Sequence, residues 1–165
     1  MPRESQPSSV QSKRPDDPIS FYSTRDPYGA FSNFAPYPIT LKGRVWPTSE
    51  HYFQAQKFLG TPHEEEIRLT KSPTIAARMG RSRARPLRSD WDAVKDEIML
   101  EAVRAKFTQH PALRELLLGT GTARIVEHTS RDRYWGDGGD GSGENRLGQI
   151  LMRVRDELRG TPQPQ

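Results

Sequence analysis

The sequence predicts an α+β fold, with one compact, mostly helical domain and a small hairpin or sheet near its N-terminus. Three observations predict it. Helical periods dominate after residue 46, short alternating segments precede them, and strands and helices follow in mixed order without βαβ repetition. A chain of 165 residues, 33% of them apolar, suits one well-buried core and is short for two domains.

The composition excludes several classes of protein. Because the chain has no cysteine, it forms no disulfide, offers no thiolate to a metal and has no cysteine nucleophile. No stretch approaches the ~18 consecutive apolar residues of a membrane span, and the N-terminal residues lack the apolar block of a secretory signal. We therefore expect a cytoplasmic protein without a membrane partner. The net charge of +4 is compatible with anionic ligands such as phosphates.

The folded domain is expected between residues 19 and 159. Residues 1–18 are rich in Pro, Ser and Gln and carry no apolar period, which predicts a disordered leader. Residues 160–165, rich in Pro and Gln, predict a disordered tail.

Short strands and turns come first in the domain. Residues 19–22 alternate as a first strand, whereas residues 28–34 are aromatic-rich but turn-like. Two alternating segments, 39–41 and 44–46, flank a Lys42-Gly43 turn. This arrangement predicts a β-hairpin whose second strand leads directly into the first helix.

The segment from Trp46 to Phe58 predicts that helix. Pro47 is followed by Thr48 and Ser49, which are candidate N-caps, and then by residues that tolerate a helix.

This helix carries chemically active side chains on one face. Glu50 and Lys57 are seven residues apart, which is two helical turns, and Phe53 and Gln54 lie between them. An acid, an amide, a base and aromatic rings in so short a segment are typical of a small-molecule pocket. The alternative is a half-exposed helix with a solvated polar stripe.

Two helices are predicted in the middle of the chain. The first begins at Ser72-Pro73 and ends near Gly80. The second has the apolar period of an amphipathic helix up to Gln109. Ser89 and Asp92 form the pattern of a capping box at its start.

The remaining elements are two helices and a strand between them. Pro111 opens a short helix that Gly119 closes. Residues 123–128 contain β-branched side chains and predict a strand. Asn145 is expected to be the N-cap of a final helix, whose apolar residues from Leu147 to Leu158 follow a clear helical period.

Two features suggest phosphate recognition, each with an alternative. Five arginines crowd the end of the helix after Ser72 and the loop that follows: Arg78, Arg81, Arg83, Arg85 and Arg88. They form either a solvated face or a rim that attracts phosphate. The glycine-rich loop from Gly136 to Gly143 precedes a helix start and suits a phosphate or a ribose hydroxyl, or it is a flexible linker. Its spacing matches neither a dinucleotide fingerprint nor a Walker loop, and the ligand spacing of a calcium loop is missing.

Metal and hydroxyl-nucleophile chemistry are not indicated. The four histidines, His51, His63, His110 and His128, form no H-x-x-x-H pair, so we expect no metal site. The chain also has no nucleophile-elbow motif.

Carboxylates and a lysine remain as the reactive groups. Hydrolysis at the anomeric carbon of a sugar needs a carboxylate and an acid for the leaving group, for which Glu50 and Asp132 are candidates. Lys57 is able instead to attack that carbon and form a Schiff base, provided that burial lowers its pKa. The aromatic residues Trp46, Trp91, Tyr134 and Trp135 suit stacking on a flat base, although Trp46 and Trp91 fit a core equally well.

The sequence as a whole resembles the NADAR family, also called YbiA-like. The resemblance runs from about residue 21 to residue 158. It rests on these matching segments: 31–34 (FSNF), 46–58 (WPTSEHYFQAQKF), 90–92 (DWD), 106–107 (KF), 120–121 (TG), 132–136 (DRYWG) and 143–152 (GENRLGQILM).

The resemblance implies a mostly helical α+β fold and an N-glycosidase that uses no metal or other cofactor. Two substrate classes are associated with such proteins: phosphoribosylamino-pyrimidines of riboflavin biosynthesis, and ADP-ribose attached to guanine, including guanine in nucleic acid. Carried onto this chain, the catalytic candidates are Glu50, Lys57 and Asp132. The candidate substrate-binding residues are Ser32, Asn33, Phe34, Trp46, Gln54, Trp91, Trp135, Gly136 and Asn145.

Two other functions compete with the enzyme. The same pocket would suit a non-catalytic module that binds ADP-ribose or NAD, and the arginine cluster would suit a nucleic-acid-binding domain. The motifs leave open the choice between the two substrates, the division of roles between Glu50 and Lys57, and the oligomeric state.

Overall fold

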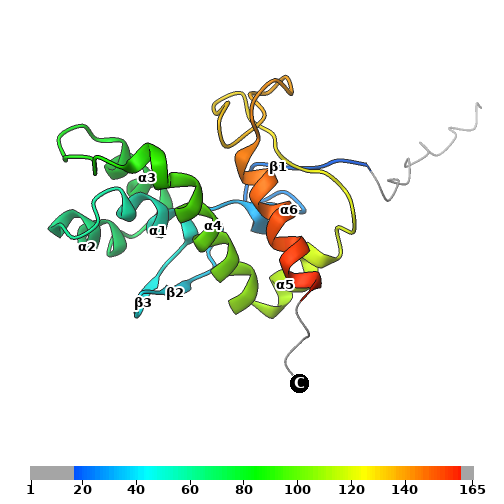
Figure 1. Ribbon diagram of the computed structural model, residues 1–165, viewed down its shortest axis with the longest axis horizontal. Coiled ribbons are helices and arrows are strands. Elements are labelled where there is room, and N and C mark those ends of the chain that lie inside the picture. The colour runs from blue at the N-terminus through cyan, green and yellow to red at the C-terminus, as the bar shows by residue number, and fades with distance from the viewer. Residues whose placement is uncertain (1–16, 161–165) are drawn as a thin grey trace, which may run out of the picture.

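The computed structural model describes residues 17–160, and the predicted leader and tail lie outside this range apart from Asp17, Pro18 and Gly160. The predicted α+β class is confirmed (Figure 1). None of the helices in these residues is long and apolar enough to cross a membrane. The elements are β1 (Ile19–Phe21), the 3-10 helix η1 (Gly29–Phe31), β2 (Ile39–Leu41), β3 (Arg44–Trp46), α1 (Ser49–Gln56), α2 (Pro62–Arg68), α3 (Pro73–Arg81), α4 (Trp91–Gln109), α5 (Pro111–Leu118), β4 (Ile125–Glu127) and α6 (Arg146–Arg159).

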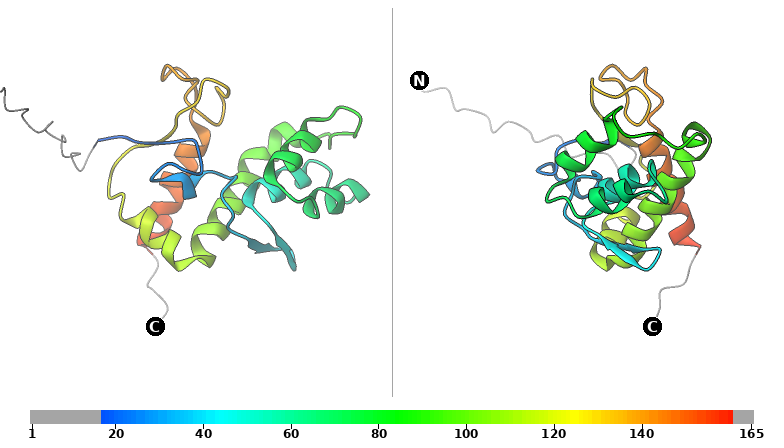
Figure 2. Two further views of the ribbon diagram at one scale, coloured as in Figure 1. Left: turned by 180° about the vertical axis from the view of Figure 1, so that it is seen from behind. Right: turned by 90° about the vertical axis from the view of Figure 1, so that its left-hand side faces the viewer.

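The long helix α4 crosses the middle of the molecule. Helices α1, α2 and α3 lie on one side of it, and α5, α6, β1 and β4 lie on the other (Figures 1 and 2). The apolar period predicted for this helix is confirmed, because Met99, Val103 and Phe107 are all buried in the core. The core is therefore continuous across α4, and two groups of elements meet at this helix.

The strands form two separate two-stranded sheets. The predicted hairpin is confirmed: β2 pairs antiparallel with β3, and Lys42 and Gly43 both have positive φ at the turn. The first strand instead pairs in parallel with β4, with Ile19 opposite Ile125. This long-range pairing joins the start of the described chain to the segment before the glycine-rich loop.

Side-chain caps start the helices on one side of α4. Thr48 caps α1 through a hydrogen bond that its hydroxyl accepts from the His51 N–H at 3.1 Å, which confirms one of the two predicted caps. Ser72 caps α3 in the same way. The short helix α2 was not predicted, although Thr61 caps it and Pro62 occupies its first turn.

The predicted capping box at Ser89 and Asp92 is wrong. Helix α4 begins at Trp91 with Asp90 at the N-cap position, and no side chain caps it. The Asp90 carboxylate instead accepts two hydrogen bonds from Arg88, at 2.6 and 3.0 Å. A nearby guanidinium has therefore replaced the backbone N–H groups as the partner of the carboxylate.

Lys106 of α4 is buried where the predicted apolar face of the helix meets the turn after η1. Its Nζ donates a hydrogen bond to the Ser32 carbonyl at 2.8 Å, and the rings of Tyr37 and Phe107 lie 5.8 and 5.5 Å away. Burial lowers the pKa of Lys106 to about 7, because the charged ammonium loses its hydration. This lysine therefore ties the turn to the central helix largely as a neutral amine above pH 7.

We expect Lys106 to make stability depend on pH. Between pH 7 and about 10.5 the unfolded chain still binds the lysine proton and the folded chain does not, so stability rises with pH. Relative to Lys106→Met, the wild type should gain roughly 2–3 kcal/mol in unfolding free energy between pH 7 and 9.5. Urea unfolding of both proteins at several pH values measures this difference, and a pH-independent difference would contradict it.

Candidate active site

Helix α1 is buried along its whole length despite its polar sequence. Its buried polar residues are Ser49, Glu50, His51, Gln54 and Gln56. The predicted alternative of a solvated polar stripe is therefore wrong. Because buried polar groups require partners, the elements around α1 supply them.

Three of these polar residues have structural partners outside the helix. The Ser49 hydroxyl donates to Asn33 Oδ1 at 2.9 Å, and the His51 ring contacts the Thr48 hydroxyl at 2.8 Å. Lys42 Nζ donates to Gln56 Oε1 at 2.7 Å. The other two, Glu50 and Gln54, bond to each other.

The structure brings Glu50, Gln54 and Lys57 together as predicted from their spacing. Gln54 Nε2 donates to Glu50 Oε1 at 2.8 Å. Burial raises the pKa of Glu50, and the Gln54 hydrogen bond and the charge of Lys57 oppose this rise. Burial lowers the pKa of Lys57, against the effect of the Glu50 charge. A buried lysine with a lowered pKa has a larger fraction of neutral, nucleophilic amine.

The end of α3 closes this group from one side. Lys57 is the C-cap residue of α1, and its Nζ donates to the Gly80 carbonyl at 3.3 Å. Gly80 has no room for a side chain, because a Cβ there would lie 1.9 Å from Gln54 Oε1. The glycine therefore allows α3 to approach α1 closely enough to hold both Gln54 and Lys57.

Aromatic rings cover the same group. The Phe53 ring lies 5.1 Å from the Trp91 ring and 5.4 Å from the Trp135 ring. Lys57 Nζ lies 5.6 Å from the centre of the Trp91 ring. Trp91 is thus placed beside the amine, and Trp135 lies against the same Phe53 ring, where both rings are able to exclude water.

Asp132 lies on the segment that faces α1 from the other side of the molecule. Its Oδ1 accepts hydrogen bonds from the backbone N–H groups of Tyr134 and Trp135, at 2.9 and 2.8 Å. Its negative charge contributes to the raised pKa of Glu50, so the two carboxylates lie near enough to interact electrostatically. The three predicted catalytic candidates therefore share one site.

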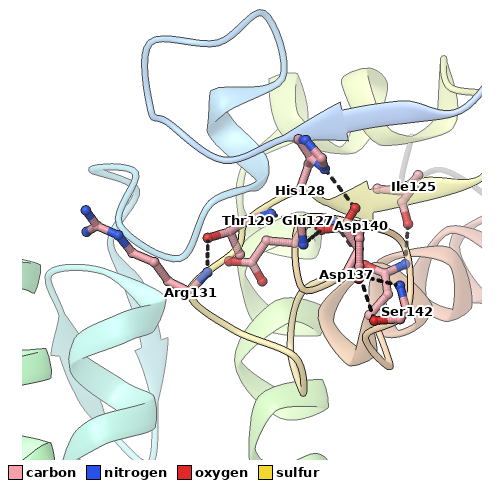
Figure 3. A network of polar contacts seen from close by, with 10 residues as sticks. Ile125, Glu127, His128, Thr129, Arg131, Asp137, Asp140 and Ser142 are labelled. Atoms are coloured by element: carbon pink, nitrogen blue, oxygen red, sulfur yellow. Dashed lines mark hydrogen bonds and ion pairs between the residues drawn. The ribbon is translucent and has the colours of Figure 1, made fainter.

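The glycine-rich loop folds on itself around Asp137. This carboxylate contacts His128 Nδ1 at 2.7 Å and accepts hydrogen bonds from the N–H groups of Thr129 and Gly139, at 3.0 and 2.9 Å (Figure 3). The alternative of a flexible linker is therefore not what the structure shows. The glycines serve this tight packing: a Cβ at Gly136 would lie 2.9 Å from the Glu127 carbonyl oxygen.

Asn145 occupies the predicted N-cap position of α6 but does not cap the helix. It has a φ of 51°, and its side chain is 2% exposed. Its Nδ2 donates to the Ile125 carbonyl at 2.9 Å, and its Oδ1 accepts from the Glu127 N–H at 3.0 Å. Both polar ends of the amide therefore hold β4, so we assign Asn145 to positioning β4 instead of to a ribose contact.

The remaining predicted binding residues divide into two groups. Trp46 is 0% exposed, with its Nε1 donating to the Leu41 carbonyl at 3.0 Å, so its ring belongs to the core. The turn of Ser32, Asn33 and Phe34 lies next to the start of α1, where the Glu50 N–H donates to the Asn33 carbonyl at 3.2 Å. This turn borders the site, whereas the Trp46 ring contributes to the core.

The predicted arginine cluster is only partly related to the site. Arg85 pairs with Glu66, and Arg88 with Asp90. The charge of Arg81 affects the pKa values of both Glu50 and Lys57, so Arg81 lies at the edge of the site.

Sequence reasoning missed one carboxylate, Glu127 at the end of β4. Its Oε2 is buried and, within residues 17–160, has no hydrogen-bond partner. Burial and the negative charges of Asp132, Glu50 and Asp137 raise its pKa to about 7. The available signal was an acidic residue directly after two β-branched residues that end a buried strand.

Comparison with known proteins agrees with this geometry. A family model described as the NADAR domain matches residues 20–159. The chain belongs to the NADAR family. The match includes every element from β1 to α6 and thus all of the residues that form the site.

Two relatives that are named N-glycosidases are similar to this chain over most of its length. N-glycosidase YbiA of Escherichia coli (strain K12) is 58% identical over 149 residues, which cover 90% of this chain and 93% of that protein. Its solution NMR structure superposes with a TM-score of 0.82, covering 92% of this chain and 90% of that one. N-glycosidase Npun_R5314 of Nostoc punctiforme is 47% identical, over 86% of this chain and 92% of that protein.

One further relative is longer. Riboflavin biosynthesis protein VVA0006 of Vibrio vulnificus is 43% identical over 150 residues, which cover 91% of this chain and 41% of that protein. The names of the two shorter relatives support N-glycosidase activity for this NADAR chain in general. Within residues 17–160, no group of three or more His, Asp or Glu residues is arranged to hold a metal ion.

We expect Gly80→Ala to impair the enzyme through Gln54. The new Cβ displaces the Gln54 amide, so Glu50 loses its hydrogen-bond donor and Lys57 shifts with the Gly80 carbonyl. N-glycosidase kcat/KM should fall about ten- to a hundredfold, with about 1–3 kcal/mol lost in stability. Gly160→Ala is the control, because the nearest atom to its Cβ is 3.7 Å away. Full activity in Gly80→Ala would contradict the predicted link.

Proposed function

We propose that the chain hydrolyses the N-glycosidic bond between ribose 5-phosphate and an amino-pyrimidine, with Glu50, Lys57 and Asp132 as its reactive groups. The observation that carries this proposal is the buried group of Glu50, Gln54 and Lys57, which faces Asp132 and lies under aromatic rings. Acid–base chemistry at an anomeric carbon needs such a combination.

The names of relatives support the choice of substrate. The Vibrio vulnificus relative is named a riboflavin biosynthesis protein. A phosphoribosylamino-pyrimidine is an intermediate of riboflavin biosynthesis. ADP-ribosyl-guanine has the same bond between a nitrogen and the anomeric carbon of a phosphorylated ribose. Arg81 at the edge of the site favours an anionic substrate of either kind.

Two roles are compatible with the position of Lys57. In the first, the neutral amine bonds to the anomeric carbon as the base departs, and water later releases the opened sugar from the Schiff base. In the second, the ammonium holds the phosphate and water attacks the carbon directly. In both, Glu50 accepts the proton of the attacking group, because it is the carboxylate whose charge acts on Lys57.

The other residues orient the substrate in this proposal. One oxygen of Asp132 is held by two backbone N–H groups, which aims the other oxygen at the ribose hydroxyls. Trp91 and Trp135 contact the base and keep water away from the Schiff base. A non-catalytic ADP-ribose binder would use the same surfaces but would release no base.

A cleavage assay tests the proposal. Wild type, Glu50→Gln, Lys57→Ala and the control Lys71→Ala, an exposed lysine outside the site, are incubated with each of two substrates. The substrates are a phosphoribosylamino-pyrimidine and ADP-ribosylated guanine in DNA, with products identified by mass spectrometry. We expect the wild type and Lys71→Ala to cleave the first, and both site variants to lose at least about a hundredfold in kcat. Binding of ADP-ribose without release of any base would favour the binding module.

Reductive trapping separates the two roles of Lys57. If the amine attacks the anomeric carbon, borohydride added during turnover reduces the Schiff base and leaves ribose 5-phosphate attached to Lys57. We expect a single adduct on the tryptic peptide that contains Lys57, and none in Lys57→Ala. An unmodified peptide under turnover conditions would assign Lys57 to the phosphate.

A further inference from the structure

Three carboxylates lie near one another at this site. Glu50 comes from α1, Glu127 from β4 and Asp132 from the following loop, and the charges of Glu50 and Asp132 both act on Glu127. Lys57 acts on Glu50. Because carboxylates that are buried together repel one another when ionised, at least one of the three is expected to hold a proton near neutral pH.

Hydrogen bonds indicate which carboxylate holds the proton. Asp132 accepts hydrogen bonds from two backbone N–H groups through its Oδ1. Burial raises the pKa of Glu50 as well, but Glu50 accepts the Gln54 N–H and the charge of Lys57 acts on it, and both oppose this rise. Glu127 differs from both, because its buried Oε2 accepts no hydrogen bond from the described residues and no cation is among the groups that act on it. The proton therefore belongs on Glu127.

The backbone of Glu127 is fixed on both sides. Its N–H donates to Asn145 Oδ1 at 3.0 Å, and its carbonyl accepts from the Asp137 N–H at 2.9 Å. In Figure 3 the carboxylate points away from the hydrogen bonds that Asp137 makes. The chain therefore fixes the backbone at Glu127 without supplying a hydrogen-bond donor to Oε2 of its side chain.

Cleavage of the proposed substrate requires a proton donor, a role that the proposed function gives to none of its residues. The bond between the anomeric carbon and nitrogen breaks with its electron pair on nitrogen, and an amino-pyrimidine departs readily only when that nitrogen is protonated. Glu50 is already used to accept the proton of the attacking group. We propose that Glu127 is the acid that protonates the departing nitrogen, an inference that rests on the proposed function.

The protons and bonds balance in this scheme. The carboxylic acid of Glu127 gives its proton to nitrogen and becomes a carboxylate, while the attacking water or Lys57 amine forms the new bond to carbon and gives its proton to Glu50. For water attack, the net change is base plus ribose 5-phosphate from substrate plus water. A pKa of about 7 keeps a substantial fraction of Glu127 protonated at neutral pH and suits it to this transfer.

The experiment compares Glu127→Gln with the wild type across pH 5.5 to 9, with the phosphoribosylamino-pyrimidine as substrate. Because the acid must be protonated to act, wild-type kcat should fall as the pH rises above about 7. In Glu127→Gln, kcat should be lower by about a hundredfold or more, and this alkaline decline should disappear. Binding of ribose 5-phosphate, measured by calorimetry, should change less than threefold. The matched control is Glu144→Gln, an exposed carboxylate near the same loop.

A second variant removes the risk that Glu127→Gln fails to fold. Glu127→Asp keeps an acid at the position and should recover part of kcat together with the alkaline decline. A wild-type kcat in Glu127→Gln, or an alkaline decline that persists in it, would overturn the role of Glu127 alone, because the wild type still cleaves the substrate. Equal loss of kcat and ribose 5-phosphate binding would show a structural role. A wild type that cleaves neither substrate would overturn both this inference and the proposed function.

Discussion

The structure depends on the burial of a polar helix. Helix α1 contributes five polar residues to the interior, and each must find a hydrogen-bond partner because a buried polar group without one costs about 1–3 kcal/mol. Neighbouring elements supply these partners: Asn33 for Ser49, Thr48 for His51 and Lys42 for Gln56. The N-terminal turn and hairpin are therefore arranged so that they supply hydrogen-bond partners to the buried polar side chains of α1.

Glu50 and Lys57 bond to the Gln54 amide and the Gly80 carbonyl, and they also carry the reactive groups of the proposed site. The buried Glu50 carboxylate and the half-buried Lys57 amine each lose hydration, and their mutual attraction offsets only part of that cost. Both remain displaced from their ordinary pKa values in the direction of the neutral form. Such displaced groups are characteristic of reactive sites, because either can exchange a proton or form a bond at neutral pH.

The sequence predicted the elements whose determinants are local. Helix α6 has an apolar period, α1 has Thr48 as its cap, and the hairpin has the Lys42-Gly43 turn, so short-range patterns define all three. The capping box at Ser89 failed because α4 begins one residue later than the box requires, with Asp90 at the N-cap position and its carboxylate bound by Arg88. Helix α2 is only seven residues long and has little apolar period to detect.

The candidate site was predictable on α1 and much less so on the opposite side. Glu50, Gln54 and Lys57 are related by helical spacing, so their proximity follows from the sequence. Glu127 joins them only through the parallel pairing of β1 with β4 and the packing around α4, which are long-range contacts. Trp46 and Asn145 illustrate the reverse case: both belong to motifs of the NADAR family, yet one supports the core and the other holds β4.

Because the site is formed from two sides of α4, its acid and its amine are also separated from each other. An ammonium next to a carboxylic acid lowers the pKa of the acid and favours its ionised form, whereas a reaction that uses an acid and an amine needs both in one pocket. Lys57 acts on Glu50, which lies on the same helix, whereas the groups that act on Glu127 are all anionic. Glu127 is thus outside the direct electrostatic influence of Lys57, whereas Glu50 interacts with both. In the proposed reaction, the substrate lies between these groups and connects the attacking group to the departing nitrogen.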